Sequence, residues 1–165
     1  MTTVTSSGRA KVTLVGDTDI RIERVFDAPK HLVYRAVSEP ELIKRWWNAK
    51  RGVVTVCEVD QRVGGNWRYV MVTPSGQEVA FHGTILELVP GEKVVQTELY
   101  EMPGIPEEDA TINTMELTES GGRTTMTVVT HCRTPEIRDM IIGSGMEAGM
   151  QDAYDLLEDV AKSLA

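Results

Sequence analysis

Three histidines are the side chains best suited to general acid–base chemistry, and none has a partner at a recognisable spacing. His31 lies at the expected start of a helix, and His82 and His131 lie on expected strands. A catalytic histidine needs a nucleophile or carboxylate positioned beside it, which the sequence does not show. We predict no catalytic residue, and we assign the histidines to hydrogen bonds at the surface or at the edge of a cavity.

The two cysteines, Cys57 and Cys132, stand far apart in the sequence. They form no CxxC motif and no cluster with histidine, so we predict no metal site and no cofactor. Two reduced, buried thiols are typical of a cytosolic protein. The first residues contain no apolar signal segment, and no stretch is apolar enough to span a membrane. We therefore expect a cytoplasmic protein without membrane insertion.

The distribution of charge argues against nucleic acid and anionic membranes as partners. The formal net charge is −8, and the one basic spot, at residues 44–51, is surrounded by acidic residues. Both kinds of partner require a basic face. A small molecule or another protein remains as the partner to consider.

A set of large apolar side chains is expected on one inner surface. Trp67, Tyr69 and Met71 alternate along one expected strand and so share a face. Trp46 and Trp47 project about 100° apart on a helix, so one can pack in the core while the other faces the mouth of a cavity. The other members of the set are Phe81, Leu99, Met115, Met126, Met146 and Met150. These side chains could fill a core or line an adaptable cavity, for which methionine is well suited.

Three charged residues, Arg68, Glu87 and Glu98, also fall on expected strands. A charge that faces inward must be paired or hydrogen-bonded, and it could orient the polar head of a ligand. Facing outward, the same residues would form cross-strand ion pairs worth about 0–1 kcal/mol. The pattern leaves both arrangements open.

A long C-terminal helix must position these groups. Its apolar stripe consists of Met146, Met150, Ala153, Leu157, Val160 and Leu164, and polar residues such as Gln151, Asp155 and Glu158 occupy the opposite side. Such a stripe needs an apolar surface to pack on. Thr134 and Pro135 are suited to cap the start of the helical region, and the glycines at 143 and 145 predict a kink between two helices.

The remaining elements predict an α+β fold with the order β-α-α-β6-α. The expected strands are 19–26, 53–59, 66–72, 78–89, 93–100, 110–118 and 124–132, with helices at 31–37 and 41–46 and an acidic loop at 102–109. Short turns between successive strands predict an antiparallel meander. Gly83 predicts a bulge or bend. We expect a flexible segment at 1–17 and a single domain at 18–165.

Short motifs in order along the chain resemble the SRPBCC proteins, and more narrowly the subgroup named after the activator of the heat-shock-protein-90 ATPase. The motifs are Arg24-Val-Phe-Asp-Ala-Pro29, Val33-Tyr-Arg-Ala36, Pro40-Glu-Leu42, Arg45-Trp-Trp47, Gly64-Gly-Asn-Trp-Arg-Tyr69, Gly83-Thr-Ile-Leu-Glu87, Val95-Gln-Thr-Glu98, Gly122-Arg-Thr124 and Gly145-Met-Glu-Ala-Gly149. The resemblance implies the helix-grip, or Bet v 1-like, fold. In that fold a curved sheet wraps around the long helix and leaves a cavity between them.

The superfamily includes lipid and sterol carriers, plant hormone receptors and polyketide cyclases, which share an apolar cavity. We therefore predict a monomeric or homodimeric protein that binds a small apolar or amphipathic ligand. The predicted lining residues are Trp47, Trp67, Tyr69, Met71, Phe81, Leu99, Met115, Met126, Met146 and Met150. A chaperone-interaction module related to the activator is the alternative, and an enzyme of the cyclase or hydrolase kind is the third hypothesis.

Overall fold

Nine strands form one antiparallel sheet in the described part of this computed structural model, which comprises residues 2–5 and 9–165. The strands are β1 (Thr2–Thr5), β2 (Lys11–Val15), β3 (Asp19–Phe26), β4 (Val53–Val59), β5 (Asn66–Val72), β6 (Glu78–Val89), β7 (Lys93–Tyr100), β8 (Thr111–Ser120) and β9 (Arg123–His131). The helices are α1 (Lys30–Ser38), α2 (Pro40–Ile43), the 3₁₀ turn η1 (Glu107–Asp109), α3 (Pro135–Gly143) and α4 (Met146–Ser163).

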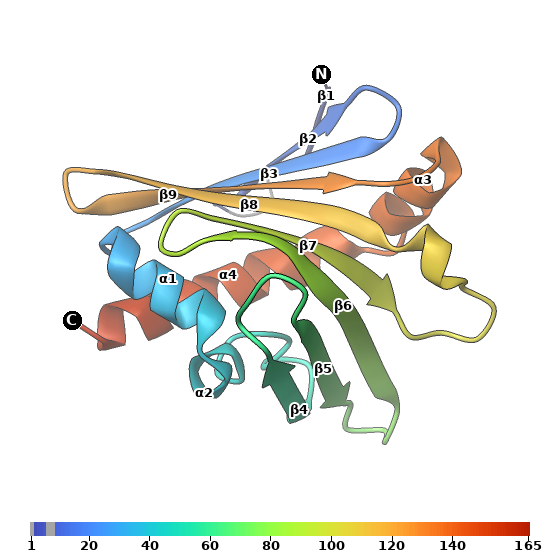
Figure 1. The fold of residues 1–165 in the computed structure, drawn as a ribbon, viewed down its shortest axis with the longest axis horizontal. Helices are drawn as coiled ribbons and strands as arrows, with labels where there is room; N and C mark the ends of the chain where they lie inside the picture. The colour runs from blue at the N-terminus through green and yellow to red at the C-terminus, as the bar shows by residue number, and fades with distance from the viewer. Residues whose placement is uncertain (1, 6–8) are drawn as a thin grey trace.

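The sheet order is β1-β2-β3-β9-β8-β7-β6-β5-β4, so the strands from β4 to β9 form the predicted meander. Figure 1 shows the sheet curving around α4, with α1 beside α4. This is the helix-grip fold that the sequence predicted. We call the concave side, which carries α4, the inner face.

Alternation along the strands explains why the inner face is apolar under α4. Ile20, Ile22 and Phe26 of β3 point to this face and are buried. Leu157 and Val160 of α4 are buried too, and they pack in one cluster with Phe26. The apolar stripe of α4 therefore packs against the sheet, as its spacing predicts, and the burial of apolar area is the main favourable contribution to folding.

The break between α3 and α4 confirms the predicted kink. The side chain of Thr134 accepts a hydrogen bond from the backbone N–H of Ile137, and Pro135 occupies the first helical turn. Gly145 has φ of 80°, a left-handed conformation that glycine adopts without steric cost. The chain can therefore turn between the two helices and begin α4 in a new direction.

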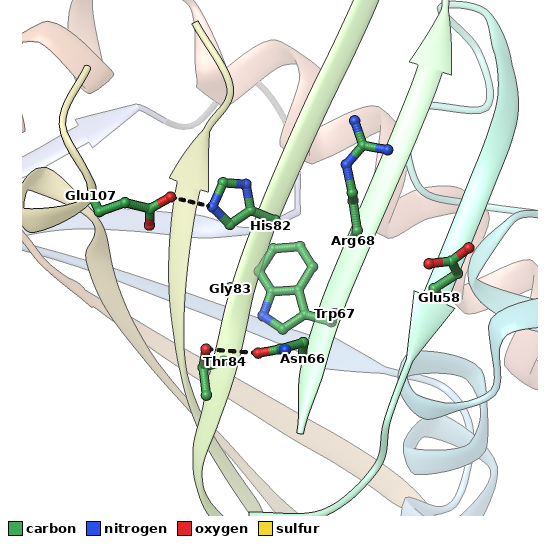
Figure 2. A pocket seen from close by; sticks show the side chains of 8 residues that line it. All are labelled: Glu58, Asn66, Trp67, Arg68, His82, Gly83, Thr84 and Glu107. Atoms are coloured by element: carbon green, nitrogen blue, oxygen red, sulfur yellow. Dashed lines mark hydrogen bonds and ion pairs between the residues drawn. The ribbon is translucent and has the colours of Figure 1, made fainter. Parts of the chain in front are cut away.

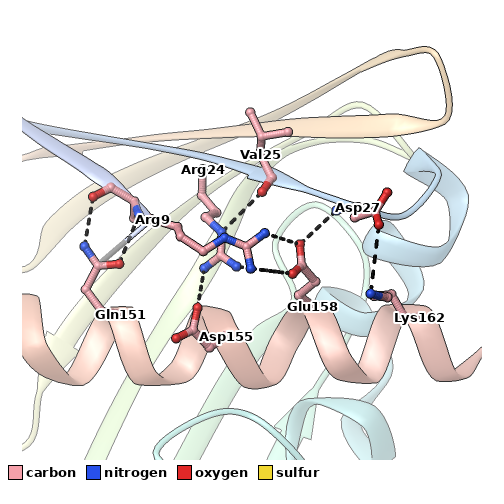
Figure 3. Close-up of polar contacts among 9 residues, drawn as sticks. Arg9, Arg24, Val25, Asp27, Gln151, Asp155, Glu158 and Lys162 are labelled. Carbon is pink, nitrogen blue, oxygen red and sulfur yellow. Dashed lines mark hydrogen bonds and ion pairs between the residues drawn. The ribbon is translucent and has the colours of Figure 1, made fainter. Parts of the chain in front are cut away.

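The polar side of α4 is less exposed than the sequence indicated, because β2 and β3 cover part of it (Figure 3). The Gln151 side chain accepts from the backbone N–H of Ala10 at 3.0 Å and donates to the Ala10 carbonyl at 2.8 Å. Glu158, only 6% exposed, accepts two hydrogen bonds from Arg9 and one from the backbone N–H of Asp27. These contacts fasten α4 to the sheet.

The N-terminal segment also differs from the sequence prediction. Residues 11–15, expected to be flexible, form β2, which pairs with β3 along its whole length. Val12 is fully buried and Ala10 is nearly so, which gives this segment a place in the core. The prediction for residues 1 and 6–8 lies outside the described residues. The boundary at residue 18 stays a prediction.

Two local expectations need correction. The irregular register in β6 lies between Ile85 and Glu87, not at Gly83. Gly83 is needed instead for close packing, because a Cβ atom there would lie 1.8 Å from the Thr97 carbonyl oxygen. The second short helix, expected to reach residue 46, ends at Ile43 and continues as turns.

Candidate functional site

An aromatic group lies on the inner face of β5, β6 and β7. The Trp47 ring contacts Tyr69 at 5.3 Å and Phe81 at 5.9 Å between centroids, both in edge-on geometry. Phe81 stacks on Tyr100 at 5.0 Å. Tyr69 and Phe81 are directly opposite in the β5–β6 register, as are Phe81 and Tyr100 in the β6–β7 register. Cross-strand pairs share a face, so strand register brings these four rings together. We call them the aromatic group.

The indole of Trp67 forms the floor beside this group. Trp67 is opposite Gly83 in the register, and its Nε1–H donates to the Thr97 carbonyl at 3.1 Å. A Cβ atom at position 83 would lie 2.6 Å from that nitrogen. Trp67 also lies 4.7 Å from the Tyr69 ring. The glycine thus provides the room in which the indole lies flat against the sheet.

A carboxyl group, Glu98, lies on the same face as the aromatic group. It precedes Tyr100 by two residues on β7, so both side chains point to the inner face. Asn113 of β8 donates from Nδ2 to Glu98 Oε2 at 3.1 Å. Glu98 retains some accessible surface, yet the surrounding protein desolvates it and raises its pKa above the usual value. No ion pair to Glu98 is present among the described residues.

Two phenols share this environment. Burial raises the pKa of both Tyr69 on β5 and Tyr154 on α4, and the Glu98 carboxylate raises each further. Within the described residues, the Oδ1 of Asn113 on β8 is buried and has no hydrogen-bond partner, whereas neither phenol oxygen is a buried atom of this kind. Polar atoms inside a protein normally have partners. These atoms, with Glu98, form what we call the polar end of the site.

The apolar core is divided around this region. One cluster joins the C-terminal half of α4 to α1, and a second joins its N-terminal half to β2 and β3. The third cluster, built on Trp67, Ile85 and Val94, contains no residue of α4, and Tyr34 of α1 covers part of it. The side chains between the second and third clusters, including Glu98 and Tyr154, remain partly exposed although they face inward.

The predicted lining residues therefore separate into groups. Trp47, Trp67, Tyr69 and Phe81 lie together, and Met115 packs against their cluster. Met71 shares this strand face and is buried, with its sulfur close to Gly52.

The other methionines lie elsewhere on the inner face. Met126 is a buried member of the cluster around Phe26, and Met146 and Met150 pack against Val12 and its neighbours at the opposite end of the sheet.

Leu99 does not line the inner face, contrary to the prediction. It is opposite His82 in the β6–β7 register, one position away from the inward-facing pair Phe81–Tyr100, so it faces the outer side of the sheet. Glu98 and Tyr100 occupy the inner positions of this strand instead. The apolar character of Leu99 favoured the wrong face because β7 carries apolar and polar residues on both of its faces.

The outer face has a groove of about 430 Å³, shown in Figure 2, that runs along β5 and β6. Arg68 forms two hydrogen bonds to Glu101, at 2.8 and 2.9 Å. His82 contacts Glu101 through Nδ1 at 2.9 Å and Glu107 through Nε2 at 2.8 Å. Arg68 and His82 thus pair with Glu101 and Glu107 and hold the loop at residues 101–109 against the sheet, while Glu58, which also lines the groove, forms no ion pair within the described residues.

The pairing of His82 does not suit a general base. Burial lowers its pKa, but the hydrogen bonds to Glu101 and Glu107 outweigh burial and raise the pKa overall. Both ring nitrogens are occupied by carboxylates, so no free nitrogen is available to accept a proton. Arg68 and His82 together hold the pKa of Glu101 down to about 2. His131 similarly contacts Asp19 at 2.6 Å. These histidines are surface hydrogen-bonding groups, as predicted.

Sequence reasoning identified Glu98 only as a charge that could orient a ligand if it faced inward. It missed Tyr100, Asn113 and Tyr154. The alternation along β7 could have indicated two of them, because Glu98 and Tyr100 lie an even number of residues from the buried Val94 and so share its face of the strand. The cysteines are buried and free, as expected, and burial raises the pKa of Cys57 and Cys132 to about 11. Such thiols are protonated and unreactive at neutral pH.

Comparison with known protein families shows to which family the chain belongs. The family model for Activator of Hsp90 ATPase homolog 1-like protein matches residues 27–162. The chain belongs to this family. The resemblance noted in the sequence is thereby confirmed, as is the place of the chain among SRPBCC domains of the Bet v 1-like fold. No curated protein matches the chain.

Solved structures of bacterial proteins share the fold. A protein from Rhodobacter sphaeroides has 26% identity and a TM-score of 0.84, over 94% of this chain and 99% of that one. A protein from Nitrosomonas europaea has 27% identity and a TM-score of 0.79, over 93% and 100%. A protein from Chromobacterium violaceum has 31% identity and a TM-score of 0.73, over 88% and 98%.

No group of three or more histidine, cysteine or acidic side chains in residues 2–5 and 9–165 is arranged to hold a metal ion. None of the helices in the same ranges has the length and apolar character needed to cross a membrane.

Proposed function

We propose that this protein binds a small amphipathic molecule on the inner face of its sheet. The apolar body of the ligand lies against the aromatic group, and its polar end reaches Glu98 and Asn113. The observation that supports this most is the partial exposure of inward-facing rings beside a polar end in which Asn113 Oδ1 is buried without a partner and Glu98 has no counter-charge in the described residues. Binding sites for small molecules combine such apolar walls with a few convergent polar groups.

The division of the core supports the same placement. A sheet face that was only structural would be covered by α4 along its whole length. Instead the cluster around Trp67 is covered by Tyr34 and by Trp47, which comes from the turns after α2. Arg51 from the same connection pairs with Asp152 of α4 at 3.4 Å. The ligand would lie between this connection, α4 and the sheet.

The alternatives have less support. Of the charged groups that line the groove on the outer face, Arg68, His82 and Glu107 are already paired, which leaves Glu58 alone for a ligand. A chaperone-interaction surface would require a contiguous apolar patch. The exposed large apolar side chains among the described residues are dispersed over several elements: Val25, Val53, Val63, Leu86, Val89, Met102, Ile112 and Met140. An enzyme would need an acid–base pair at the site, and Glu98 has beside it an amide and two phenols whose pKa burial raises.

Binding of a neutral fluorescent reporter, N-phenylnaphthylamine, tests the proposal. We expect saturable, one-to-one binding that Trp47→Leu weakens by about tenfold, because the ring that covers Tyr69 and Phe81 is lost. Val53→Ser is the matched control, since Val53 is 70% exposed and lies on the edge strand β4. Reporter binding that is unsaturable, or equal in both variants, refutes the proposed site. Native mass spectrometry of the purified protein would show any molecule retained from the host.

A further inference from the structure

Glu98 is a carboxyl group without a counter-charge in the described residues. Its one hydrogen bond comes from Asn113, which is neutral. The two arginines that contact α4 from inside the fold are already engaged, Arg24 with Asp155 at 3.0 Å and Arg51 with Asp152 at 3.4 Å. A buried charge without a partner is costly, so a carboxyl group in this position favours any bound cation that can reach it.

The polar end also has more acceptors than donors. Glu98 Oε1 accepts no hydrogen bond, and Asn113 Oδ1 is buried without a partner. The phenol oxygens of Tyr69 and Tyr154 can accept as well. A ligand hydroxyl has a single O–H to offer, whereas a primary ammonium group has three N–H donors and no acceptor. The number and kind of unpaired atoms therefore match an ammonium group better than a hydroxyl.

The aromatic group supplies the second element of cation recognition. The faces of Trp, Tyr and Phe rings attract a cation electrostatically, and the attraction is larger where water is excluded. Trp47, Tyr69, Phe81 and Tyr100 are in mutual contact on the face that carries Glu98. A net charge of −8 further favours the approach of cations over anions.

We propose that the ligand is an organic cation, a protonated primary amine on an aromatic or apolar body, whose ammonium group lies between Glu98, Asn113 and the rings of the aromatic group. The inference rests on the proposed function, because it specifies the ligand of that same site. The ammonium provides the counter-charge that Glu98 lacks and an N–H donor for the buried Oδ1 of Asn113. The body of the amine lies against the rings.

The proposal makes binding dependent on pH in a defined direction. The titratable groups that face Glu98 are the phenols of Tyr69 and Tyr154, which stay neutral because burial raises the pKa of both. Desolvation raises the pKa of Glu98, so its protonated form persists to higher pH than that of an exposed carboxyl group. A bound cation favours the ionised form, so at any pH at which the free Glu98 is protonated, binding releases a proton, and affinity rises with pH until Glu98 is fully ionised. It falls again only when the amine itself loses its proton, near pH 10 for an aliphatic amine, about the value for lysine.

Matched probes test this. Naphthylethylamine and naphthylethanol share an apolar body and differ in the cationic group. We expect calorimetric titration of the wild-type protein at about pH 8 to show the amine binding about tenfold tighter than the alcohol or more. The amine should also bind more tightly at about pH 8 than at about pH 5, with proton release visible in buffers of different ionisation enthalpy.

Glu98→Gln separates charge from shape. It keeps the size of the side chain, so the affinities for amine and alcohol should come within about twofold of each other. Glu87→Gln is the matched control: Glu87 is also on a central strand, but it pairs with Lys93 on the outer face at 3.4 Å, so the preference for the amine should persist. Circular dichroism of both variants checks folding, and the pH dependence of the wild-type protein needs no variant.

The outcomes distinguish the two proposals. If amine and alcohol bind the wild-type protein equally, the cation inference is wrong while the amphipathic site stands. If the preference for the amine survives in Glu98→Gln, or is lost equally in Glu87→Gln, Glu98 does not bind the ammonium group and the inference is wrong. If neither probe nor the neutral reporter binds, the proposed function fails along with it.

Discussion

Removal of the charge on Glu158 should destabilise the protein far more than removal of a charge elsewhere on α4. Glu158 accepts hydrogen bonds from Arg9 and from the backbone of Asp27, and it lies 3.6 Å from the guanidinium of Arg24 (Figure 3). The Arg24 side chain is fully buried and also lies over the Phe26 ring. With Glu158→Gln, this buried cation retains a hydrogen bond to the Val25 carbonyl and one ion-pair partner, Asp155, whose side chain is half exposed.

Loss of one partner from a buried ion pair costs about 3–5 kcal/mol. Because Asp155 remains 3.0 Å from Arg24, we expect the lower part of this range, about 2–3 kcal/mol. In urea denaturation with a slope of about 2 kcal/mol per molar, the midpoint should fall by about 1–1.5 M. Asp159→Asn, on the exposed side of the same helix, should change stability by less than about 0.5 kcal/mol. Equal midpoints for the two variants would refute the reasoning.

The acid dependence provides an independent check. Burial opposes ionisation of Glu158, but the Asp27 backbone N–H, Arg9 and Arg24 outweigh it and lower its pKa below the usual value. A carboxylate with a lowered pKa stabilises the fold above its unfolded pKa, and this contribution is lost as pH falls through its folded pKa. The stability of Glu158→Gln should therefore fall less steeply with acid than that of the wild type. The double variant Arg24→Met/Glu158→Leu should recover much of the lost stability, because the charges it leaves unpaired, Arg9 and Asp155, are exposed and none is buried.

Two further predictions concern the sheet. Gly83→Ala should cost more than about 3 kcal/mol in urea denaturation, since its Cβ would meet the Thr97 carbonyl oxygen and the Trp67 indole; a cost below about 1 kcal/mol would show that the two strands separate easily. The His82 contacts stabilise the loop at residues 101–109 below the unfolded pKa of the imidazole, and this contribution is lost as pH rises through the raised folded pKa. Hydrogen-exchange protection of that loop should fall over this pH range in the wild type and stay constant in His82→Gln.

The strands of the meander could be predicted closely because local chemistry determines them. Glycine and proline turns, such as Gly64-Gly65 and Pro90-Gly91, separate runs of alternating residues, and the observed bounds of β4 to β7 match the expected ones. β2 was missed although Val12 and Leu14 alternate within it, because the polar, small residues before it indicated a disordered start. Its stability depends on pairing with β3 and on Gln151, which are contacts distant in sequence.

The site was harder to predict because it depends on which face of each strand turns inward. In β5 one face carries Trp67 and Tyr69, so the inward-facing residues were clear from the sequence. In β7 each face carries apolar and polar residues. Which of them face inward is decided by the register with β6, and no local property of the sequence determines that register. Leu99 was therefore placed inside and Tyr100 was overlooked. Likewise, the even spacing of the α4 stripe could not show that Met146 and Met150 lie at the far end of the sheet from the aromatic group.

The sheet carries ionisable side chains on both faces, and the contrast between the two faces indicates where function should be sought. On the outer face, Arg68, His82 and Glu101 satisfy one another, so their arrangement is explained by folding alone. On the inner face, Glu98 has no counter-charge in the described residues and Asn113 Oδ1 has no partner. Such groups lower the stability of the free protein. Sites that break the rules of stability without local compensation tend to be functional sites, and a bound cation would supply the compensation that the fold itself does not.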